Sequence, residues 1–87
     1  MTVHVLHHHY DTPDVEGNEI LGVYHSIEDA REDMSFAAAV IRAQFPPGVW
    51  DKDMTWQEDN EIHLGFDNTG GRIATIYCWE IISMEVQ

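Results

Sequence analysis

The last strand-like segment of this chain constrains its fold more than any other feature. Residues 73–86 read IATIYCWEIISMEV, a long run with apolar side chains at both odd and even positions. Because successive side chains of a strand point to opposite faces, this segment is apolar on both faces. A strand of that kind is typical of the middle of a sheet, where it pairs on both sides. We therefore predict a sheet that holds its C-terminal strand in the interior.

A hairpin is expected at the start of the chain. The segment TVHVLHHHY, residues 2–10, begins with β-branched and apolar residues and stops at DTPDVEGN, which is dense in loop-forming residues. The segment NEILGVYH, residues 18–25, then resumes a strand pattern. The two segments predict an antiparallel hairpin whose loop is too long for a tight two-residue turn.

A second hairpin is expected at the end of the chain. EIHLGF, residues 61–66, is joined to the last strand by DNTGG, a hairpin signal. Pairing Phe66 with Arg72 divides the side chains between two faces. One face then carries Ile62, Leu64, Phe66, Ala74, Ile76 and Cys78. The other face carries His63, Thr75, Tyr77 and Trp79.

One amphipathic helix is expected between the hairpins. Ser26 resembles a helix N-cap, with acidic residues following it in the first turns, where the helix dipole favours negative charge. Apolar residues then recur at spacings of three and four, which indicates one buried face: Ala30, Met34, Ala37, Ala38, Ile41 and Phe45. The Pro-Pro-Gly sequence at 46–48 ends the helix, so we predict it from Ile27 to about Gln44.

These elements predict an α+β fold in a single domain, residues 1–87. The irregular acidic segment 49–60 is expected to hold a short strand around Met54 to Trp56. The architecture is then a two-layer sandwich, in which one helix packs on one face of an antiparallel sheet of four or five strands, ββα(β)ββ.

The cellular compartment follows from what the sequence lacks. Its one cysteine, Cys78, cannot close an intramolecular disulfide, and no Cys-x-x-Cys or Cys/His quartet suggests a structural zinc site. The N-terminal residues have no basic region, and no stretch approaches the roughly 20 apolar residues that span a bilayer. We therefore expect a soluble, cytoplasmic protein.

Three consecutive histidines raise the question of a metal site. In a strand, His7 and His9 share one face, about 6.6 Å apart along the strand, whereas His4 and His8 share the other face about 13 Å apart. His7 and His9 are thus weak candidate ligands, because a zinc site needs a third and usually a fourth protein ligand. We expect strand histidines and no metal ion.

The pairing of the first hairpin bears on that question. A register that pairs Tyr10 with Glu19 sets His4 opposite His25. The same register sets His7 opposite Gly22 and His9 opposite Ile20, and neither of these residues supplies a metal ligand.

Catalytic motifs are missing from the sequence. It contains no Gly-x-Ser-x-Gly, no phosphate-cradling glycine loop and no His-Glu-x-x-His. Cys78 would be a nucleophile only with His63 beside it, and the register above places the two on opposite faces. Carboxylate pairs such as Asp51 with Asp53 follow from the abundance of acids alone. We predict a protein that is not an enzyme and has no cofactor.

The charge is the strongest compositional feature. There are 16 acidic against four basic residues, for a net charge of -12. Such a field repels nucleic acid and anionic lipid and favours association with basic surfaces. We therefore expect no direct nucleic-acid or membrane partner, but a basic protein, with nucleic-acid-binding enzymes as one class. The alternative is that the acidity serves solubility alone.

Candidate partner-binding residues lie in the first loop and in the acidic segment 49–60. Trp50 and Trp56 sit among carboxylates there, an arrangement that suits anchors for a basic partner. The alternative reading is that these rings cap the end of the sheet. The full candidate set is Asp11, Asp14, Glu16, Glu19, Trp50, Asp51, Asp53, Trp56, Glu58 and Asp59.

Two resemblances bear on function. The pattern Val3-x-Val5-Leu6-x-His8-x-Tyr10, followed by Ile20-Leu21-Gly22-Val23-Tyr24-x-Ser26-x-Glu28-x-Ala30, resembles the opening of a family of small uncharacterised bacterial and phage domains. That resemblance covers about the first 30 residues well and implies only the fold argued above. In size and acidity the chain also resembles small phage or mobile-element inhibitors, including nucleic-acid-mimicking anti-CRISPR proteins, which occupy basic grooves of host enzymes.

Three hypotheses follow. The first is a non-enzymatic acidic interaction or inhibitor protein that binds a basic protein surface and excludes nucleic acid from it. The second is a metal-binding or metal-sensing protein that uses His7 and His9 with a distal acid, Glu61 or Asp59. The third is a homodimer or larger homo-oligomer, formed through a strand edge or a spare apolar face of the sheet.

Overall fold

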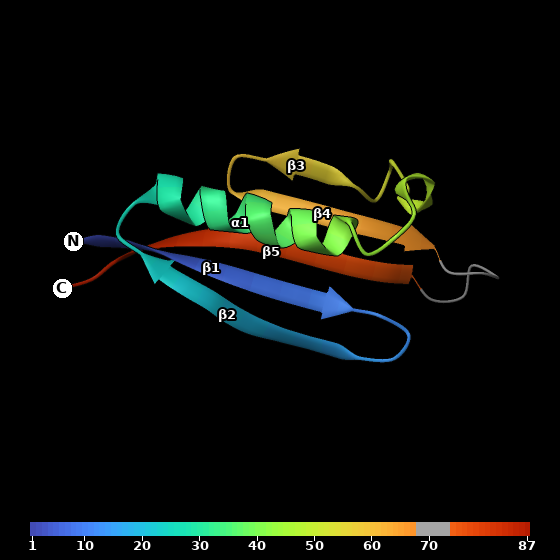
Figure 1. The fold of residues 1–87 in the computed structure, drawn as a ribbon. Coiled ribbons are helices and arrows are strands. Elements are labelled where there is room, and N and C mark those ends of the chain that lie inside the picture. The colour runs from blue at the N-terminus through green and yellow to red at the C-terminus, as the bar shows by residue number, and fades with distance from the viewer. Residues whose placement is uncertain (68–73) are drawn as a thin grey trace.

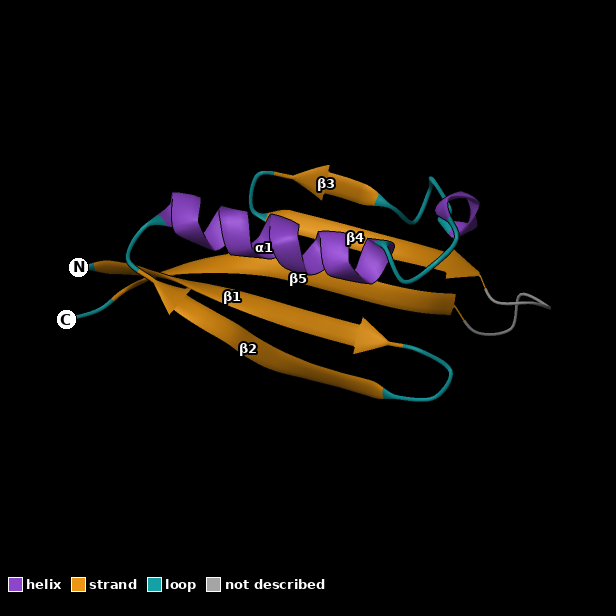
Figure 2. Cartoon of the chain, in the orientation of Figure 1, coloured by secondary structure: helices purple, strands orange, loops and turns teal. Residues whose placement is uncertain are grey.

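The computed structural model describes residues 1–67 and 74–87 and places them in two layers. One antiparallel sheet has the strand order β2-β1-β5-β4-β3, and the helix α1 packs across one of its faces (Figures 1 and 2). The α+β sandwich predicted from the sequence is confirmed. The elements are β1 (Thr2–Asp11), β2 (Glu16–Tyr24), α1 (Ile27–Arg42), the 3-10 helix η1 (Pro47–Val49), β3 (Trp56–Glu58), β4 (Glu61–Asp67) and β5 (Ala74–Glu85).

Strand β5 lies in the middle of the sheet, between β1 and β4, as its apolar character on both faces predicts. It pairs with β1 over ten residues and with β4 over seven. Its buried side chains Thr75, Trp79 and Ile81 point toward α1. We call the face of the sheet opposite α1 the open face.

The helix forms where the sequence predicts it and ends two residues earlier than expected. The hydroxyl oxygen of Ser26 accepts a hydrogen bond from the backbone N–H of Asp29 at 3.3 Å, which satisfies one of the free donors of the first turn. The helix buries Ala30, Met34 and Ala38 against the sheet. These three residues belong to the predicted apolar face.

The core lies between α1 and the three central strands. Its fully buried side chains come from α1, β1, β4 and β5: Leu6, Met34, Ile62, Leu64 and Trp79. One polar ring, His8, is buried among them. Burial of this apolar area is the main stabilising term for a domain of this size.

The register of the first hairpin differs from the predicted one. Tyr10 pairs with Gly17, not with Glu19, and His4 lies opposite Tyr24, not His25. The reason is twofold: the loop is shorter than expected, and a β-bulge between Leu6 and His7 shifts the remainder of the strand by one residue. The residues opposite the other two histidines are Ile20 for His7 and Asn18 for His9.

The register of the second hairpin was also predicted wrongly. Phe66 pairs with Thr75, three residues beyond the expected partner. The predicted turn and Arg72 lie largely outside the described residues. Because an odd shift exchanges the two faces of a strand, Cys78 lies on the open face and directly opposite His63. Thr75, Tyr77 and Trp79 share the helix side with Ile62, Leu64 and Phe66.

The acidic connection between α1 and β4 wraps around the edge of the sheet. On the helix side, the ring of Trp50 packs edge-on against Phe45 and Phe66, with centroids 5.3 and 5.4 Å apart. Met54 then lies over Gly65, where an added Cβ would come within 3.0 Å of the Met54 Cβ. Strand β3 follows at residues 56–58, slightly later than the strand expected around Met54 to Trp56.

Candidate functional site

Two rows of polar side chains cross the open face. In the first row, the strand register places His7 opposite Glu80 and Glu80 opposite Glu61. In the second row it places His9 opposite Cys78 and Cys78 opposite His63. Side chains of both rows line a shallow cavity of about 200 Å³: His7, His9, Glu61, Cys78 and Glu80. The register thus gathers imidazole, thiol and carboxylate groups from three strands.

Each imidazole of this cluster has a different neighbour. His7 Nδ1 lies 3.4 Å from Glu80 Oε1, and His9 Nδ1 lies 3.9 Å from Cys78 Sγ. His63 Nδ1 lies 2.6 Å from the carbonyl oxygen of Met54; because a carbonyl oxygen only accepts, this nitrogen is protonated and donates the hydrogen bond. Within residues 1–67 and 74–87, no three His, Cys, Asp or Glu side chains are grouped closely enough to hold a metal ion.

The thiol of Cys78 is held in its protonated form. Burial raises the pKa of Cys78, and the negative charges of Glu61 and Glu80 raise it further. Since the thiolate is the nucleophile and metal ligand, the protonated thiol is poorly suited to either task near neutral pH. The proximity of Cys78 to His9 therefore amounts to a weak polar contact in the structure.

The charge of the sheet has one sign. None of the residues in the five described strands is Lys or Arg, whereas eight are Asp or Glu. By strand alternation, most of the eight point to the open face. The eight are Asp11, Glu16, Glu19, Glu58, Glu61, Asp67, Glu80 and Glu85.

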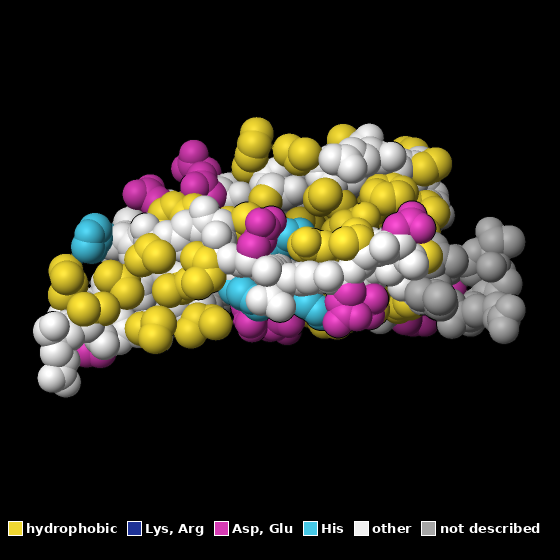
Figure 3. Space-filling model, turned by 90° about the horizontal axis from the view of Figure 1, so that it is seen from below, with side chains coloured by type: hydrophobic (Ala, Val, Ile, Leu, Met, Phe, Trp, Pro, Cys, Tyr) yellow, Lys and Arg dark blue, Asp and Glu magenta, His cyan; other side chains and the backbone are white. Residues whose placement is uncertain are grey.

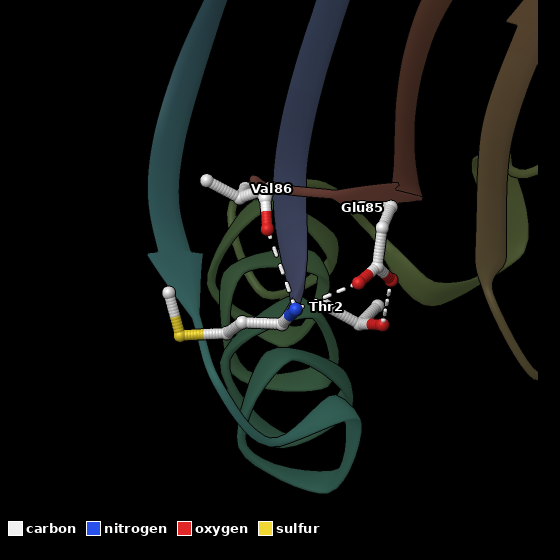
Figure 4. A network of polar contacts seen from close by, with 4 residues as sticks. Thr2, Glu85 and Val86 are labelled. Carbon is white, nitrogen blue, oxygen red and sulfur yellow. Dashed lines mark hydrogen bonds and ion pairs between the residues drawn. The ribbon is translucent and has the colours of Figure 1, made fainter.

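Ion pairs within the described residues involve only two of these carboxylates. Glu80 lies near His7, as given above, and Glu85 binds the amino group of Met1 at 2.6 Å (Figure 4). The other oxygen of Glu85 accepts a hydrogen bond from the Thr2 hydroxyl at 2.8 Å. Arg31, on α1, donates its Nε–H to Asn60 at 3.0 Å and forms no ion pair with a sheet carboxylate.

Exposed apolar side chains gather around β2 and at the adjoining end of the open face. Seen from below Figure 1, where β2 is the lowest strand, they cluster toward the end that holds both termini, and acidic and histidine side chains lie beside them (Figure 3). No Lys or Arg side chain is visible from this side (Figure 3). The exposed apolar residues are Ile20, Leu21 and Val23 on β2, Ile82 and Met84 on β5, and Phe36 and Val40 on the neighbouring helix α1.

The predicted partner-binding residues lie at two separate edges of the sheet. Asp11, Asp14, Glu16 and Glu19 flank or lie in the β1–β2 turn and on β2, one edge strand. The second group surrounds the opposite edge strand, β3. Trp50, Asp51 and Asp53 precede this strand, Trp56 and Glu58 lie on it, and Asp59 follows it. The fold therefore does not bring the two groups into one patch, and their role in binding stays a prediction.

The two candidate tryptophans differ in their environment. Trp50 belongs to the aromatic cluster with Phe45 and Phe66 and packs against the core, which is the alternative reading of this residue. Trp56 is 42% exposed and stacks on the His63 ring with centroids 4.0 Å apart. The stack places Trp56 beside the open-face cluster.

Sequence reasoning missed the juxtaposition of Cys78 with His63 and His9. The alternation of side chains within β1 predicted the shared face of His7 and His9, but the pairing of that strand with β5 decides what lies opposite them. The sequence signal for this pairing is weak, because β5 is apolar along most of its length and accepts several registers.

The chain matches no family model, no curated protein and no solved structure. The resemblances described above therefore stay predictions. Within the described residues, no helix is long and apolar enough to cross a membrane.

Proposed function

We propose that this protein is a non-enzymatic interaction domain that binds a basic protein surface through its sheet. The observation that carries the proposal is the absence of Lys and Arg from the described strands, which hold eight carboxylates. Like charges on neighbouring strands destabilise a sheet, so the fold itself gains nothing from this arrangement. A basic partner would remove the repulsion.

The open face supplies both kinds of contact that such a partner needs. Glu61 and Glu80 lie side by side on adjacent strands and offer oxygens to Arg or Lys side chains. Ile82 and Met84, 44% and 51% exposed, extend the same face with apolar surface. Protein interfaces combine an apolar centre with polar groups at the rim, and charge complementarity mainly sets the association rate and specificity.

Occupation of a basic groove would exclude nucleic acid from the partner. A surface of net negative charge competes with phosphates for the same Lys and Arg side chains. This mode is the one implied by the compositional resemblance to small acidic inhibitors. The single cysteine and the acidic surface are compatible with action in the cytoplasm, where we place the interaction.

A competition assay tests the proposal. The probe is a purified lysine-rich histone bound to fluorescently labelled duplex DNA, whose release is followed by anisotropy. The protein should displace the DNA at low salt, and the effect should weaken strongly at about 0.5 M salt because exposed charges are screened. Failure to displace DNA, or displacement that ignores salt, contradicts the proposal.

Matched charge variants distinguish the sheet from the helix. Glu61→Gln with Glu80→Gln removes two negative charges from the open face, and Asp29→Asn with Glu32→Gln removes two from α1. The sheet pair should weaken displacement several-fold more than the helix pair. Equal effects would mean that the total charge acts without a specific surface.

A further inference from the structure

We propose that the edge of β2 accepts an extended segment of the basic partner as an additional antiparallel or parallel strand. The inference rests on the proposed function and specifies where the partner is anchored. Among the described residues, strand β2 has a strand neighbour, β1, on one side only, since it stands first in the sheet order. Its other side therefore presents backbone N–H and C=O groups that an added strand can pair with.

The edge of β2 lacks two of the usual protections against pairing, although it carries two glutamates and one β-bulge. Glu16–Tyr24 is nine residues long and contains neither Lys nor Pro, the residues that most often block an edge strand. Its sequence, EGNEILGVY, has apolar side chains in its second half. Ile20 and Val23 are 64% and 62% exposed. An exposed edge whose second half is apolar is a template for another strand.

A groove lies on the helix side of this edge. It has a volume of about 310 Å³ and is lined by α1 and the sheet, with Leu21, Phe36 and Val40 among its residues. Phe36 is 72% exposed, the most exposed large apolar side chain of the described residues. Leu21 is the extra residue of the β-bulge, because it has no partner on β1 while Ile20 and Gly22 do. It also lines this groove.

The other side of the edge is apolar as well. Ile20, paired with His7, lies on the open face, and Val23, paired with Val5, lies there too. Alternate side chains of an added strand would point to the groove and to the open face in turn. The segment that fits best has apolar residues at its centre on both faces.

Charge decides between a basic segment and a second copy of this chain. Glu16 and Glu19 lie on β2 itself, and Asp33 lies beside its end, where it accepts a hydrogen bond from Tyr24 at 2.6 Å. A second copy would bring another net charge of -12 to this edge. Lys or Arg residues flanking an apolar centre would pair with the carboxylates. The occupant is therefore a basic segment of the partner.

A synthetic peptide tests the inference. The probe has alternating valine and isoleucine residues between paired lysines, and binding is measured by fluorescence anisotropy with the full chain. Binding should protect backbone amides of β2 from hydrogen exchange. A peptide with the same side chains but N-methyl groups at alternate positions cannot form the ladder, and it should bind at least tenfold more weakly.

Two exposed apolar residues provide matched variants. Phe36→Lys introduces a positive charge in the groove, and Val86→Lys introduces the same charge at an exposed apolar residue beyond the end of β5. The first should weaken peptide binding at least tenfold and the second less than twofold. Phe36 is largely exposed, so its replacement leaves the core intact.

The outcomes separate this inference from the proposed function. Binding that is lost in Val86→Lys but not in Phe36→Lys overturns the β2 site and leaves the proposed function standing. If the native protein neither binds the peptide nor displaces DNA from the histone, both proposals are overturned. A dimer of the free protein that Ile20→Lys dissociates, with no peptide binding, identifies a second copy as the occupant and also overturns the inference.

Discussion

The imidazole of His8 stacks on the indole of Trp79 inside the core, with ring centroids 4.6 Å apart and planes 13° from parallel. His8 Nδ1 donates a hydrogen bond to the carbonyl oxygen of Cys78 at 3.0 Å. The ring is thus a neutral part of the core. Burial lowers the pKa of His8 below its ordinary value of 6.5, although the Cys78 carbonyl and Glu19 oppose the shift.

The burial of His8 predicts a pH dependence of stability. The unfolded chain binds a proton at this imidazole near its ordinary pKa of 6.5, whereas the folded chain binds it only at a lower pH. The free energy of unfolding should therefore decrease as the pH falls below about 6.5. Below the folded-state pKa of His8, this imidazole is protonated in both states and causes no further decrease. Urea unfolding at several pH values measures the slope.

His8→Gln should reduce this slope, since it removes the titrating group from the core. His25→Gln removes an exposed histidine and serves as the matched control for the loss of one imidazole. An unchanged slope in His8→Gln would contradict the assignment of the pH dependence to this ring.

The hydroxyl of Tyr24 donates a hydrogen bond to Asp33 at 2.6 Å, and this bond links β2 to α1. The bond to the carboxylate, together with partial burial, raises the pKa of Tyr24 to about 12. Asp33→Asn should return the pKa toward the ordinary value of 10. Spectrophotometric titration measures the pKa of Tyr24, and the Tyr24→Phe variant identifies which ionisation belongs to this residue. Glu32→Gln removes one negative charge from the same helix and is the charge-matched control.

The same contact has a consequence for stability at high pH. A raised folded-state pKa contributes stability that is present below pH 10 and lost as the pH rises toward about 12. The loss should be smaller in Asp33→Asn. A loss of equal size in the variant would show that this hydrogen bond is not its source.

The thiol of Cys78 should react slowly for a cysteine. Its raised pKa leaves little thiolate at a pH of about 8, so the rate with a disulfide reagent should be well below that of the unfolded chain. Glu80→Gln removes one negative charge that opposes ionisation and should increase the rate. The chain has one cysteine, so the signal has a single source.

Glu16→Gln serves as the control for this experiment. Glu16 lies on the edge strand β2, two strands from β5, and its replacement should leave the rate unchanged. A rate in the native protein equal to that of the unfolded chain would contradict the burial of the thiol.

The N-cap of α1 predicts a cost for Ser26→Ala. The variant loses the acceptor for the Asp29 N–H, and the free energy of unfolding should fall by about 1 kcal/mol. Ser35→Ala makes the same chemical change at an exposed position within the helix, where alanine has the higher helix propensity. That control should be neutral or slightly stabilising in urea unfolding, and an equal loss in both variants would argue against the cap.

The sequence by itself determined the features that depend on local chemistry. The helix begins at a Ser26 cap and ends before Pro46 because hydrogen bonding and proline geometry act within a few residues. The shared face of His7 and His9 follows from strand alternation alone. The interior place of β5 follows from its apolar side chains at both odd and even positions, a pattern typical of a strand that pairs on both sides.

Only the tertiary structure decided which residues meet across the strands. A slip of three residues between β4 and β5 separates the predicted register from the observed one. It moves Cys78 from the predicted face of Ile62 and Leu64 to the open face, opposite His63. The bulge in the first hairpin likewise changes the partners of every residue beyond it. Registers depend on side chains distant in the sequence and on turn geometry, so a one-dimensional pattern that fits several pairings leaves the site undetermined.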